Sequence, residues 1–362
     1  MRGSVKKRIG VLTGGGDCPG LNAAIRAVTK TAILDYGMEV TGIKDGYVGL
    51  VENKYSQLSY EDVSGILAEG GTFLGASNKA NPFNYPSASN KSKDLSDLAI
   101  DNAKEMGLDG LVCIGGDGTL SVAYRLYKKG LKIVGIPKTI DNDLRATDFT
   151  IGFDSAVITA TEAIDKLHTT AQSHHRVMVI EVMGRYAGWL ALYSGVAGGG
   201  DIIIIPEIPY DIKKVCKRVV DRFKHGKRFS IVVVAEGARP KGGRMVVKKV
   251  VKDSTDPVRL GGIGNRIAMD VEKCTGLEAR VTSLGHLQRG GSPSPFDRML
   301  ATRLGTFACG LAARGEFGKM AALKGRDIVA VGLKDAVTSI RRVDPKHPII
   351  KSAISVGTSF AF

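Results

Sequence analysis

Residues 8–20 read RIGVLTGGGDCPG, and this stretch decides the class of fold. Residues 9–13 form an apolar run of strand length, and three consecutive glycines, residues 14–16, follow it directly. Pro19 fits the start of a helix, because a proline in the first turn needs no backbone hydrogen-bond donor. A strand that passes through a glycine turn into a helix is the repeating unit of parallel sheets covered by helices. The stretch therefore predicts an α/β protein.

Similar units recur along the rest of the chain. The other clear strand patterns lie at residues 110–114, 132–136, 177–182, 201–205 and 229–235. Runs rich in β-branched residues alternate with helical patterns, which is typical of a mainly parallel sheet with helices on its faces. Residues 239–245, RPKGGRM, carry a turn signal and predict a β-hairpin. Ligands gather beyond the carboxyl ends of parallel strands, so we expect the functional residues in the loops that follow these runs.

Length and composition limit the class of protein. The 362 residues are 43% hydrophobic, which is enough to bury a core in each of two domains. No apolar run approaches the roughly 18 residues that a membrane span needs, and the basic first residues lack the apolar stretch of a signal peptide. Five scattered cysteines without a CxxC pair argue against a disulfide framework and a structural zinc site. We expect a globular cytoplasmic protein with no membrane partner.

The balance of charge favours anionic partners. Lys and Arg exceed Asp and Glu by 51 − 36 = 15. Aromatic residues are only 6% of the chain, so stacking platforms for bases are scarce and no nucleic-acid partner is expected. Phosphorylated metabolites are the favoured class, and a non-catalytic phosphate- or nucleic-acid-binding role is the alternative.

Three strand ends carry glycines or acids: TGGGDCPG at 13–20, GGDGT at 115–119 and PKTIDND at 137–143. Glycines let backbone N–H groups approach phosphate oxygens, and the helix that follows adds its positive end. The first loop does not fit GxGxxG, and the chain has no GK[ST] motif. Any one such loop can be a plain tight turn, but three in one fold predict a phosphate cradle.

Asp117, Asp141 and Asp143 lie in two of these loops. A metal ion that bridges phosphates needs hard carboxylate oxygens, and a hydroxyl that attacks phosphorus needs a base. With a reference pKa of about 3.9, an aspartate is ionised at pH 7 and can accept that proton. Asp141 is the better candidate base, although Asp-Asn-Asp alone is also typical of a turn. Together the loops predict phosphoryl transfer.

Further along the chain, basic and polar residues fit a sugar phosphate. They are Arg176, Met183, Gly184, Arg185, Glu236, Arg280, His286 and Arg289. Arginine forks bind phosphate, whereas Glu and His suit sugar hydroxyls.

These motifs resemble the 6-phosphofructokinase family over nearly the whole chain. Other matching segments are DGYVGL at 45–50, GGTFLG at 70–75, IGFDSA at 151–156, EVMGRYAG at 181–188 and LGHLQRGGSP at 284–293. The resemblance implies two Rossmann-like three-layer domains with mainly parallel sheets and the active site in the cleft between them. Residues 1–152 plus about 288–340 would bind the nucleotide, and about 153–287 plus 341–362 the sugar phosphate. It also implies ATP-dependent phosphorylation of fructose 6-phosphate at its 1-hydroxyl in glycolysis, with Mg²⁺.

The resemblance also implies roles for the donor-side residues. Nucleotide contacts would come from Gly15, Gly16, Tyr47, Gly116, Asp117, Gly118 and Thr119, with Asp117 holding the magnesium. An ungapped match places Asn78, with Lys79 beside it, where the family's ATP enzymes usually carry an arginine on the transferred phosphate.

On the acceptor side, Thr139, Ile140 and Asp141 would meet the sugar, with Asp141 as proton acceptor. Asp143 would support Asp141, and Arg185 would stabilise charge on the transferred phosphoryl group. Met183, Gly184, Glu236, His286 and Arg289 would bind the sugar phosphate. Arg176 and Arg280 match positions that reach into a neighbouring subunit's site, which implies a homo-oligomer, commonly a tetramer.

Two positions bear on the phosphoryl donor. Gly118 in GGDG resembles the ATP enzymes of the family, whereas Lys138 in PKTIDND resembles its pyrophosphate enzymes and a branch of its ATP enzymes. A carboxylate at 118 would repel the α-phosphate of ATP by about 1 kcal/mol or more at 4 Å even in high dielectric, while glycine leaves the space open. We therefore expect ATP, with pyrophosphate as the alternative. GGDGT also occurs in NAD and lipid kinases, but PKTIDND and HLQRGG favour the sugar kinase.

Overall fold

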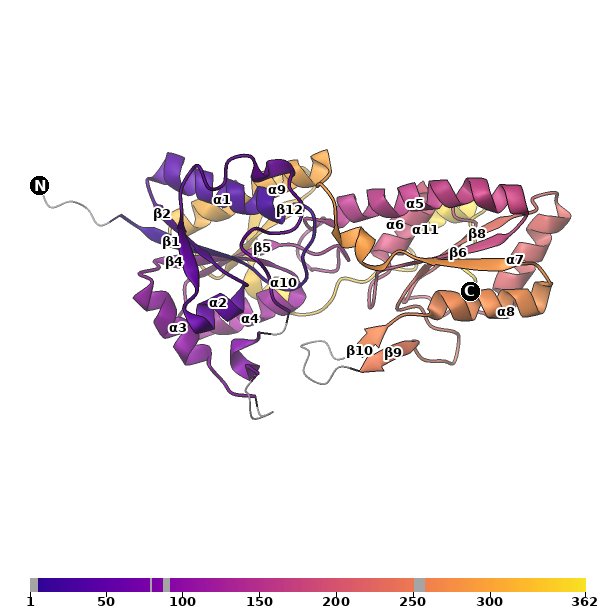
Figure 1. The fold of residues 1–362 in the computed structure, drawn as a ribbon, viewed down its shortest axis with the longest axis horizontal. Helices are drawn as coiled ribbons and strands as arrows, with labels where there is room; N and C mark the ends of the chain where they lie inside the picture. The colour runs from indigo at the N-terminus through magenta and orange to yellow at the C-terminus, as the bar shows by residue number, and fades with distance from the viewer. Residues whose placement is uncertain (1–5, 79, 87–91, 251–257) are drawn as a thin grey trace, which may run out of the picture.

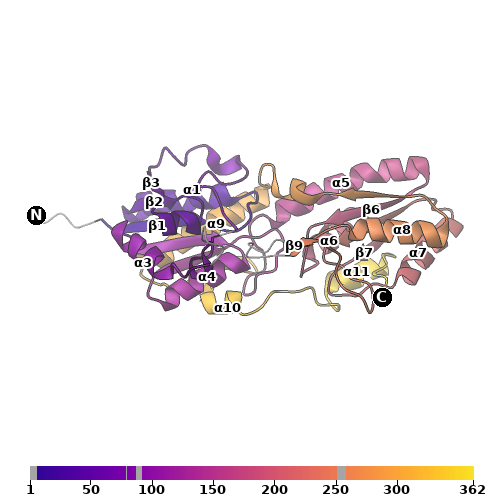
Figure 2. The same ribbon diagram turned by 60° about the horizontal axis from the view of Figure 1, so that its bottom comes forward.

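A computed structural model describes residues 6–78, 80–86, 92–250 and 258–362. Figure 1 shows two lobes that lie side by side, each built on a sheet with helices on both of its faces. Figure 2 shows the same two lobes after a turn about the horizontal axis. In the described part of the chain, no helix combines the length and the apolar character that crossing a membrane requires. The predicted α/β class with mainly parallel sheets is confirmed.

The first lobe contains a sheet with the strand order β13-β12-β5-β4-β1-β2-β3. Its strands are β1 (Arg8–Thr13), β2 (Glu39–Ile43), β3 (Tyr55–Leu58), β4 (Gly110–Gly115), β5 (Ile133–Pro137), β12 (Lys319–Lys324) and β13 (Asp327–Gly332). Only the edge strands β3 and β13 are antiparallel to their neighbours. Strand β4 is buried along its whole length, as expected for a parallel strand between two helix layers.

Helices cover both faces of this sheet (Figure 1). They are α1 (Leu21–Tyr36) and α9 (Pro295–Ala313) on one face, and α2 (Tyr47–Glu52), α3 (Ser96–Glu105), α4 (Asp117–Lys128) and α10 (Leu333–Val337) on the other. Successive strand residues point to opposite faces, so Val11 of β1 packs in the first layer and Leu12 in the second.

The second lobe contains a sheet with the strand order β11-β6-β8-β7, in which all pairs are parallel. Its strands are β6 (Val177–Val182), β7 (Ile202–Ile204), β8 (Ser230–Ala235) and β11 (Ala279–Ser283). Helices α5 (Phe153–His174) and α6 (Trp189–Ala197) cover one face, and α7 (Ile212–Lys224) and α8 (Ile263–Thr275) the other. Trp189 and Tyr193 of α6 pack against each other with ring centroids 6.3 Å apart.

The chain crosses between the lobes more than once. After β5 it enters the second lobe at α5, and η3 (Gly285–Arg289) leads it back to α9. A last crossing joins α10 to α11 (Pro348–Ser355). The short helices η1 (Ile66–Ala68) and η2 (Pro82–Asn84) lie in the first lobe. The predicted domain assignment stays a prediction.

Local details correct the expectations for residues 239–245 and for Pro19. The turn at Pro240 and Gly243 forms, but Lys241 N–H donates to the Tyr210 carbonyl instead of to a hairpin partner. The hairpin lies further on, between β9 (Val247–Val250) and β10 (Val258–Leu260). Pro19 precedes α1, because Gly20 with φ 105° turns the chain into the helix.

The expectation of no disulfide is also corrected. Cys216 of α7 and Cys274 of α8 are joined by a disulfide, with their Cα atoms 6.3 Å apart. They lie 58 residues apart in the sequence, so only the packing of the two helices reveals the pair. Among the described residues, Cys18, Cys113 and Cys309 are free and buried.

Helices α1 and α9 approach each other closely at Gly305. A Cβ atom at this position would lie 2.7 Å from Ala27 Cβ and 2.9 Å from the Ala24 carbonyl oxygen. Both neighbours belong to the body of α1 and cannot rotate away. The absence of a side chain at Gly305 therefore sets the distance between these helices.

We expect Gly305→Val to lower the free energy of unfolding by about 1–3 kcal/mol, because overpacking forces the helices apart. Met299→Val places the same side chain on α9 at a position that is 66% exposed, and we expect it to cost less than about 0.7 kcal/mol. Urea unfolding of the two variants and the wild type measures the difference. Equal stabilities of the two variants would contradict the packing argument.

Candidate functional site

The three predicted loops lie side by side at one edge of the first sheet. Strand β4 pairs with both β1 and β5, so the carboxyl ends of the three strands are neighbours. Gly14 N–H donates to the Ile114 carbonyl at 2.9 Å, and Lys138 N–H donates to the Gly115 carbonyl at 3.0 Å. The loops surround a cavity of about 250 Å³. Its lining includes Gly15, Gly16, Gly116, Gly118, Thr119, Lys138, Thr139, Ile140, Asp141 and Arg289.

Backbone rather than side chains forms the floor of this cavity. Gly15 has φ 77°, a left-handed conformation that favours glycine. A Cβ atom on Gly14 would lie 2.6 Å from Thr119 Cγ2, so the first loop and the start of α4 could not approach with a larger residue there. At Gly116, no side chain accepts a hydrogen bond from the first turn of α4. The N–H groups of that turn can therefore bind an anion.

Lys138 binds the first loop from inside the protein. Its side chain is only 3% exposed, and Nζ donates to the carbonyl oxygens of Gly14, at 3.1 Å, and Gly16. Burial lowers the pKa of this ammonium group. From the end of η3, where the chain crosses back to the first lobe, Arg289 Nη1 donates to the Asp17 carbonyl at 3.1 Å. The two cations therefore shape the loop and give the cavity a positive lining.

The third loop supplies a buried carboxylate. Oδ1 of Asp141 is buried and has no hydrogen-bond partner within the described structure. Burial raises the pKa of Asp141, while the charges of Arg289, Arg185 and Lys138 oppose the shift. An unpaired buried acceptor is rare in folded proteins and costs about 1–3 kcal/mol, so it calls for a functional explanation.

Asp143 lies beside this carboxylate. Burial, reinforced by the charges of Asp141 and Asp117, raises the pKa of Asp143 to about 7. Two neighbouring carboxylates that cannot both ionise freely are typical of sites that accept or hold a proton.

The predicted residues of the second lobe follow two neighbouring strands of its sheet. Met183, Gly184 and Arg185 follow β6, and Glu236 follows the neighbouring strand β8, so Gly237 N–H reaches the Gly184 carbonyl at 3.1 Å. Burial and then the charge of Asp141 raise the pKa of Glu236 to about 7, and the charge of Arg185 opposes this. The charge of Asp141 therefore acts on Glu236 from the first lobe.

Other predicted residues lie away from this cavity. Arg176 and Arg280 both bind Glu278, Arg176 through Nε at 2.8 Å, at the amino end of β6. His286 is exposed on η3. The roles of these side chains toward a neighbouring subunit and a sugar stay predictions.

The structure also places the remaining donor-side residues. Tyr47 is buried, and its hydroxyl donates to the Thr119 carbonyl at 2.8 Å, so it supports the start of α4 from behind. Asn78 lines a neighbouring hollow of about 330 Å³ with Gly15 and Gly16. Lys79 lies outside the described residues. The nucleotide contact of Tyr47 stays a prediction.

Asp117 is the predicted magnesium residue, and this role stays a prediction. It is half-buried at the start of α4, and burial raises its pKa. Over the ranges that the structure describes, no group of three or more His, Cys, Asp or Glu side chains is arranged around a metal. Magnesium is commonly bound by one or two carboxylates together with waters and substrate phosphates, which agrees with a single aspartate beside a phosphate cradle.

Sequence reasoning missed two residues that support the site. Asp297 accepts from Gly152 N–H at 2.9 Å and from Ser155 N–H at 2.8 Å, and so fixes the start of α5, while burial raises its pKa to about 6. The sequence feature that could have revealed Asp297 is the pattern Ser-x-x-Asp at 294–297, which is typical of a helix start. Arg341, described below, has no local motif.

The glycine loops and the cations around them define an α/β protein that binds phosphate groups. Comparison with known proteins is more specific. Residues 8–312 match the family described as Phosphofructokinase. The chain is 53% identical to ATP-dependent 6-phosphofructokinase 2 of Clostridium perfringens, over 98% of both chains. It is 52% identical to the pyrophosphate--fructose 6-phosphate 1-phosphotransferase of Streptomyces coelicolor, over 93% of this chain and 96% of that protein.

A solved structure agrees with these matches. Pichia pastoris phosphofructokinase in the T-state superposes with a TM-score of 0.79 at 33% identity. The match covers 98% of this chain and 37% of the longer Pichia chain. The protein belongs to the phosphofructokinase family.

Gly118 is the position to test for the choice of donor. The direction in which its Cβ would point is open, with no atom within 4 Å, so a side chain fits without strain. We expect Gly118→Asp to raise KM for ATP about fivefold or more, from a repulsion of about 1 kcal/mol with the α-phosphate. Gly118→Ala is the matched control and should keep KM for ATP within twofold. An unchanged KM for ATP in Gly118→Asp would contradict the role of this position.

The raised pKa of Asp143 gives a second test. The folded protein holds a proton on Asp143 up to pH of about 7, whereas the unfolded chain releases it near pH 4. The resulting stabilisation is complete below about pH 4 and is lost as the pH rises through about 7. Asp143→Asn removes the buried charge. We therefore expect its thermal midpoint to exceed that of the wild type at pH 8, with a smaller gain at pH 5.

Calorimetry at both pH values measures this, with Asp165→Asn on the exposed face of α5 as control. A gain that does not change with pH, or a loss at pH 8, would show that Asp143 is not held at a raised pKa.

Proposed function

We propose that the protein is an ATP-dependent 6-phosphofructokinase, which transfers the γ-phosphoryl group of ATP to the 1-hydroxyl of D-fructose 6-phosphate in glycolysis. The products are fructose 1,6-bisphosphate and ADP. The observation that carries the proposal is the unpartnered Oδ1 of Asp141, held between the glycine loops and the basic residues of the second lobe.

The donor is held by backbone. The N–H groups of Gly16 and of the first turn of α4 would bind the phosphates of ATP, helped by the positive end of that helix. Gly15 N–H donates to the Ser77 carbonyl at 3.2 Å, so Gly15 would contribute the space that its missing side chain leaves. Asp117 would hold Mg²⁺, and the ion would neutralise negative charge on the phosphates of the donor. Asn78 lines the neighbouring hollow together with Gly15 and Gly16 of the first loop.

The acceptor is activated by the third loop. The sugar 1-oxygen attacks the γ-phosphorus, its proton passes to Asp141, and the bond from the γ-phosphorus to the bridging oxygen of ADP breaks. Thr139 and Ile140 would place the sugar, and Asp143 would support the proton acceptor. Arg185 would bind the equatorial oxygens of the transferred group, where negative charge gathers.

The sugar and its phosphate would be held by the second lobe. Met183, Gly184, Glu236, His286 and Arg289 are the proposed contacts, with Glu236 suited to sugar hydroxyls. Arg176 and Arg280 lie together outside the cavity of their own chain, so we propose that they bind the 6-phosphate in the site of a neighbouring subunit. The proposed assembly is a homo-oligomer, a tetramer by family resemblance, that works in the cytoplasm without a membrane or nucleic-acid partner.

Pyrophosphate is the second candidate donor. Lys138 and the 52% identity to the Streptomyces pyrophosphate enzyme favour it, whereas the open position at Gly118 and the 53% identity to the Clostridium ATP enzyme favour ATP. Parallel coupled assays with fructose 6-phosphate and either ATP or pyrophosphate decide between them. Turnover with pyrophosphate but not with ATP would overturn the proposed donor.

We expect Asp141→Asn to lower kcat by roughly 10²–10⁴-fold, the usual contribution of a general base. KM for fructose 6-phosphate should change less than about threefold, because an amide preserves the shape of the side chain. Asp165→Asn, exposed on α5, is the control and should keep the wild-type kcat. Wild-type turnover in Asp141→Asn would remove Asp141 from the mechanism.

A further inference from the structure

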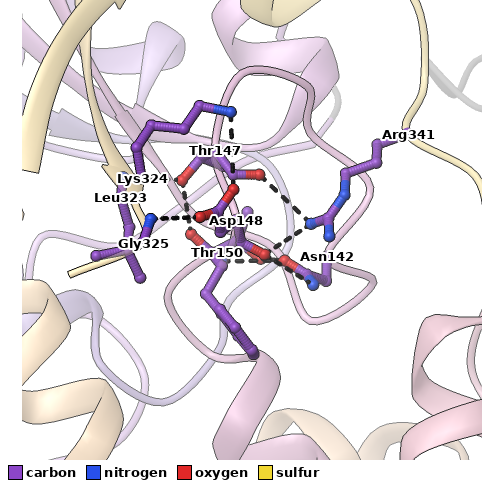
Figure 3. Close-up of polar contacts among 9 residues, drawn as sticks. Asn142, Thr147, Asp148, Thr150, Leu323, Lys324, Gly325 and Arg341 are labelled. Atoms are coloured by element: carbon purple, nitrogen blue, oxygen red, sulfur yellow. Dashed lines mark hydrogen bonds and ion pairs between the residues drawn. The ribbon is translucent and has the colours of Figure 1, made fainter. Parts of the chain in front are cut away.

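The last crossing between the lobes passes close to the loop at residues 137–143, which carries Asp141. Arg341 lies in this crossing, between α10 and α11, and its backbone N–H donates to the Asp143 carbonyl at 2.7 Å. Its guanidinium Nη1 donates to the Asp148 carbonyl at 2.7 Å and lies 3.4 Å from the Thr147 carbonyl oxygen. Figure 3 shows the Arg341 side chain reaching these carbonyl groups. Arg341 therefore binds both ends of the segment from Asp143 to Asp148.

The segment that Arg341 holds is bonded to the catalytic loop. Thr150 N–H donates to Asn142 Oδ1 at 3.1 Å, and Thr150 Oγ1 donates to the Thr139 carbonyl at 2.6 Å. Asn142 Nδ2 donates to the Asp148 carbonyl at 3.4 Å, the same oxygen that accepts from Arg341. The side chain of Arg341 thus completes a network that reaches Asn142, directly after Asp141, and the backbone of Thr139, two residues before it.

Backbone conformation makes this support necessary. Asn142 has φ 49°, a left-handed conformation that costs a residue with a side chain roughly 1–2 kcal/mol. Such a conformation persists only where surrounding contacts fix it. Asp141 and Asp143 flank Asn142, so the directions of both carboxylates depend on the bonds that hold this residue.

The other side of Arg341 contacts the second lobe. Trp189 Nε1–H donates to the Arg341 carbonyl at 3.0 Å, and the guanidinium lies 4.5 Å from the centroid of the Trp189 ring. Trp189 is the first residue of α6, directly after the loop that carries Arg185. Close by, Glu207 Oε1 accepts from Val343 N–H at 2.8 Å and from Gly188 N–H at 3.0 Å. The Arg341 side chain therefore contacts both the segment bonded to the Asp141 loop and Trp189 at the start of α6.

The Arg341 guanidinium binds backbone carbonyl groups and does not pair with the Asp148 carboxylate. The Asp148 carboxylate has other partners, since Lys324 Nζ lies 3.7 Å from Oδ1 and Gly325 N–H donates to Oδ2 at 2.7 Å. The planar guanidinium of Arg341 donates to backbone carbonyl groups through its edge, and its face packs on the indole ring of Trp189. Lysine carries one ammonium group without that plane and cannot make all of these contacts.

We propose that Arg341 is a positioning residue for phosphoryl transfer, which fixes the loop of Asp141 and Asp143 relative to the loop of Arg185 in the other lobe. The inference rests on the proposed role of Asp141 as proton acceptor. Its consequence is that loss of Arg341 slows the chemical step and leaves the binding of ATP to the glycine loops intact.

The test compares Arg341→Ala, Arg341→Lys and Arg342→Ala, an exposed neighbour in the same crossing. Steady-state kinetics gives kcat and both KM values, and circular dichroism gives the folded fraction at the assay temperature. We expect Arg341→Ala to lower kcat by about 10–100-fold per folded molecule, since a misplacement of about 1 Å can cost that much. KM for ATP should stay within twofold, Arg341→Lys should be intermediate, and Arg342→Ala should match the wild type.

Several results would overturn the inference. They are a wild-type kcat in folded Arg341→Ala, an equal loss in Arg342→Ala, and a loss that disappears when kcat is corrected for the folded fraction. Should Arg341→Ala fail to fold, Trp189→Phe removes the bond to the Arg341 carbonyl, and it must lower kcat at least threefold with an unchanged KM for ATP. Asp141→Asn in the same series separates the two proposals, because its activity reports on the proton acceptor and not on Arg341.

Discussion

A buried ammonium group is the interaction on which the site depends. Lys138 donates to carbonyl oxygens of the first glycine loop from a position with almost no contact with solvent. A buried charge without partners costs several kcal/mol, so these bonds are what allow the residue to sit there. Because Thr139 and Asp141 follow directly in the chain, the same bonds set the distance between the phosphate loop and the base loop.

The site combines this cation with carboxylates that are costly to bury. Burial raises the pKa of Asp141, Asp143 and Glu236, and the charge of Asp141 raises the pKa of the other two further. The charges of Arg185 and Arg289 oppose the shifts of Asp141 and Glu236. Such a site lowers the stability of the free protein, and residues that do so are often the ones that function requires.

Sequence patterns predict the parts of this arrangement that are local. The glycines after β1 and β4 and the acids after β5 predict a phosphate-binding site, because parallel strands bring their carboxyl ends to one sheet edge. The sequence does not reveal contacts between distant segments. The Cys216–Cys274 disulfide, the burial of Tyr47 behind α4 and the bonds of Arg341 to residues almost 200 positions away depend on packing that leaves no local motif.

The central claim is that Asp141 takes the proton of the sugar hydroxyl while backbone amides hold the phosphates of the donor. The most direct measurement is a crystal structure of the protein with fructose 6-phosphate and a non-hydrolysable ATP analogue. The account predicts the sugar 1-oxygen at hydrogen-bond distance, about 2.6–3.2 Å, from an Asp141 carboxylate oxygen, with the terminal phosphate against the N–H groups of the glycine loops. A sugar whose 1-hydroxyl points away from Asp141, or a triphosphate bound outside these loops, would contradict it.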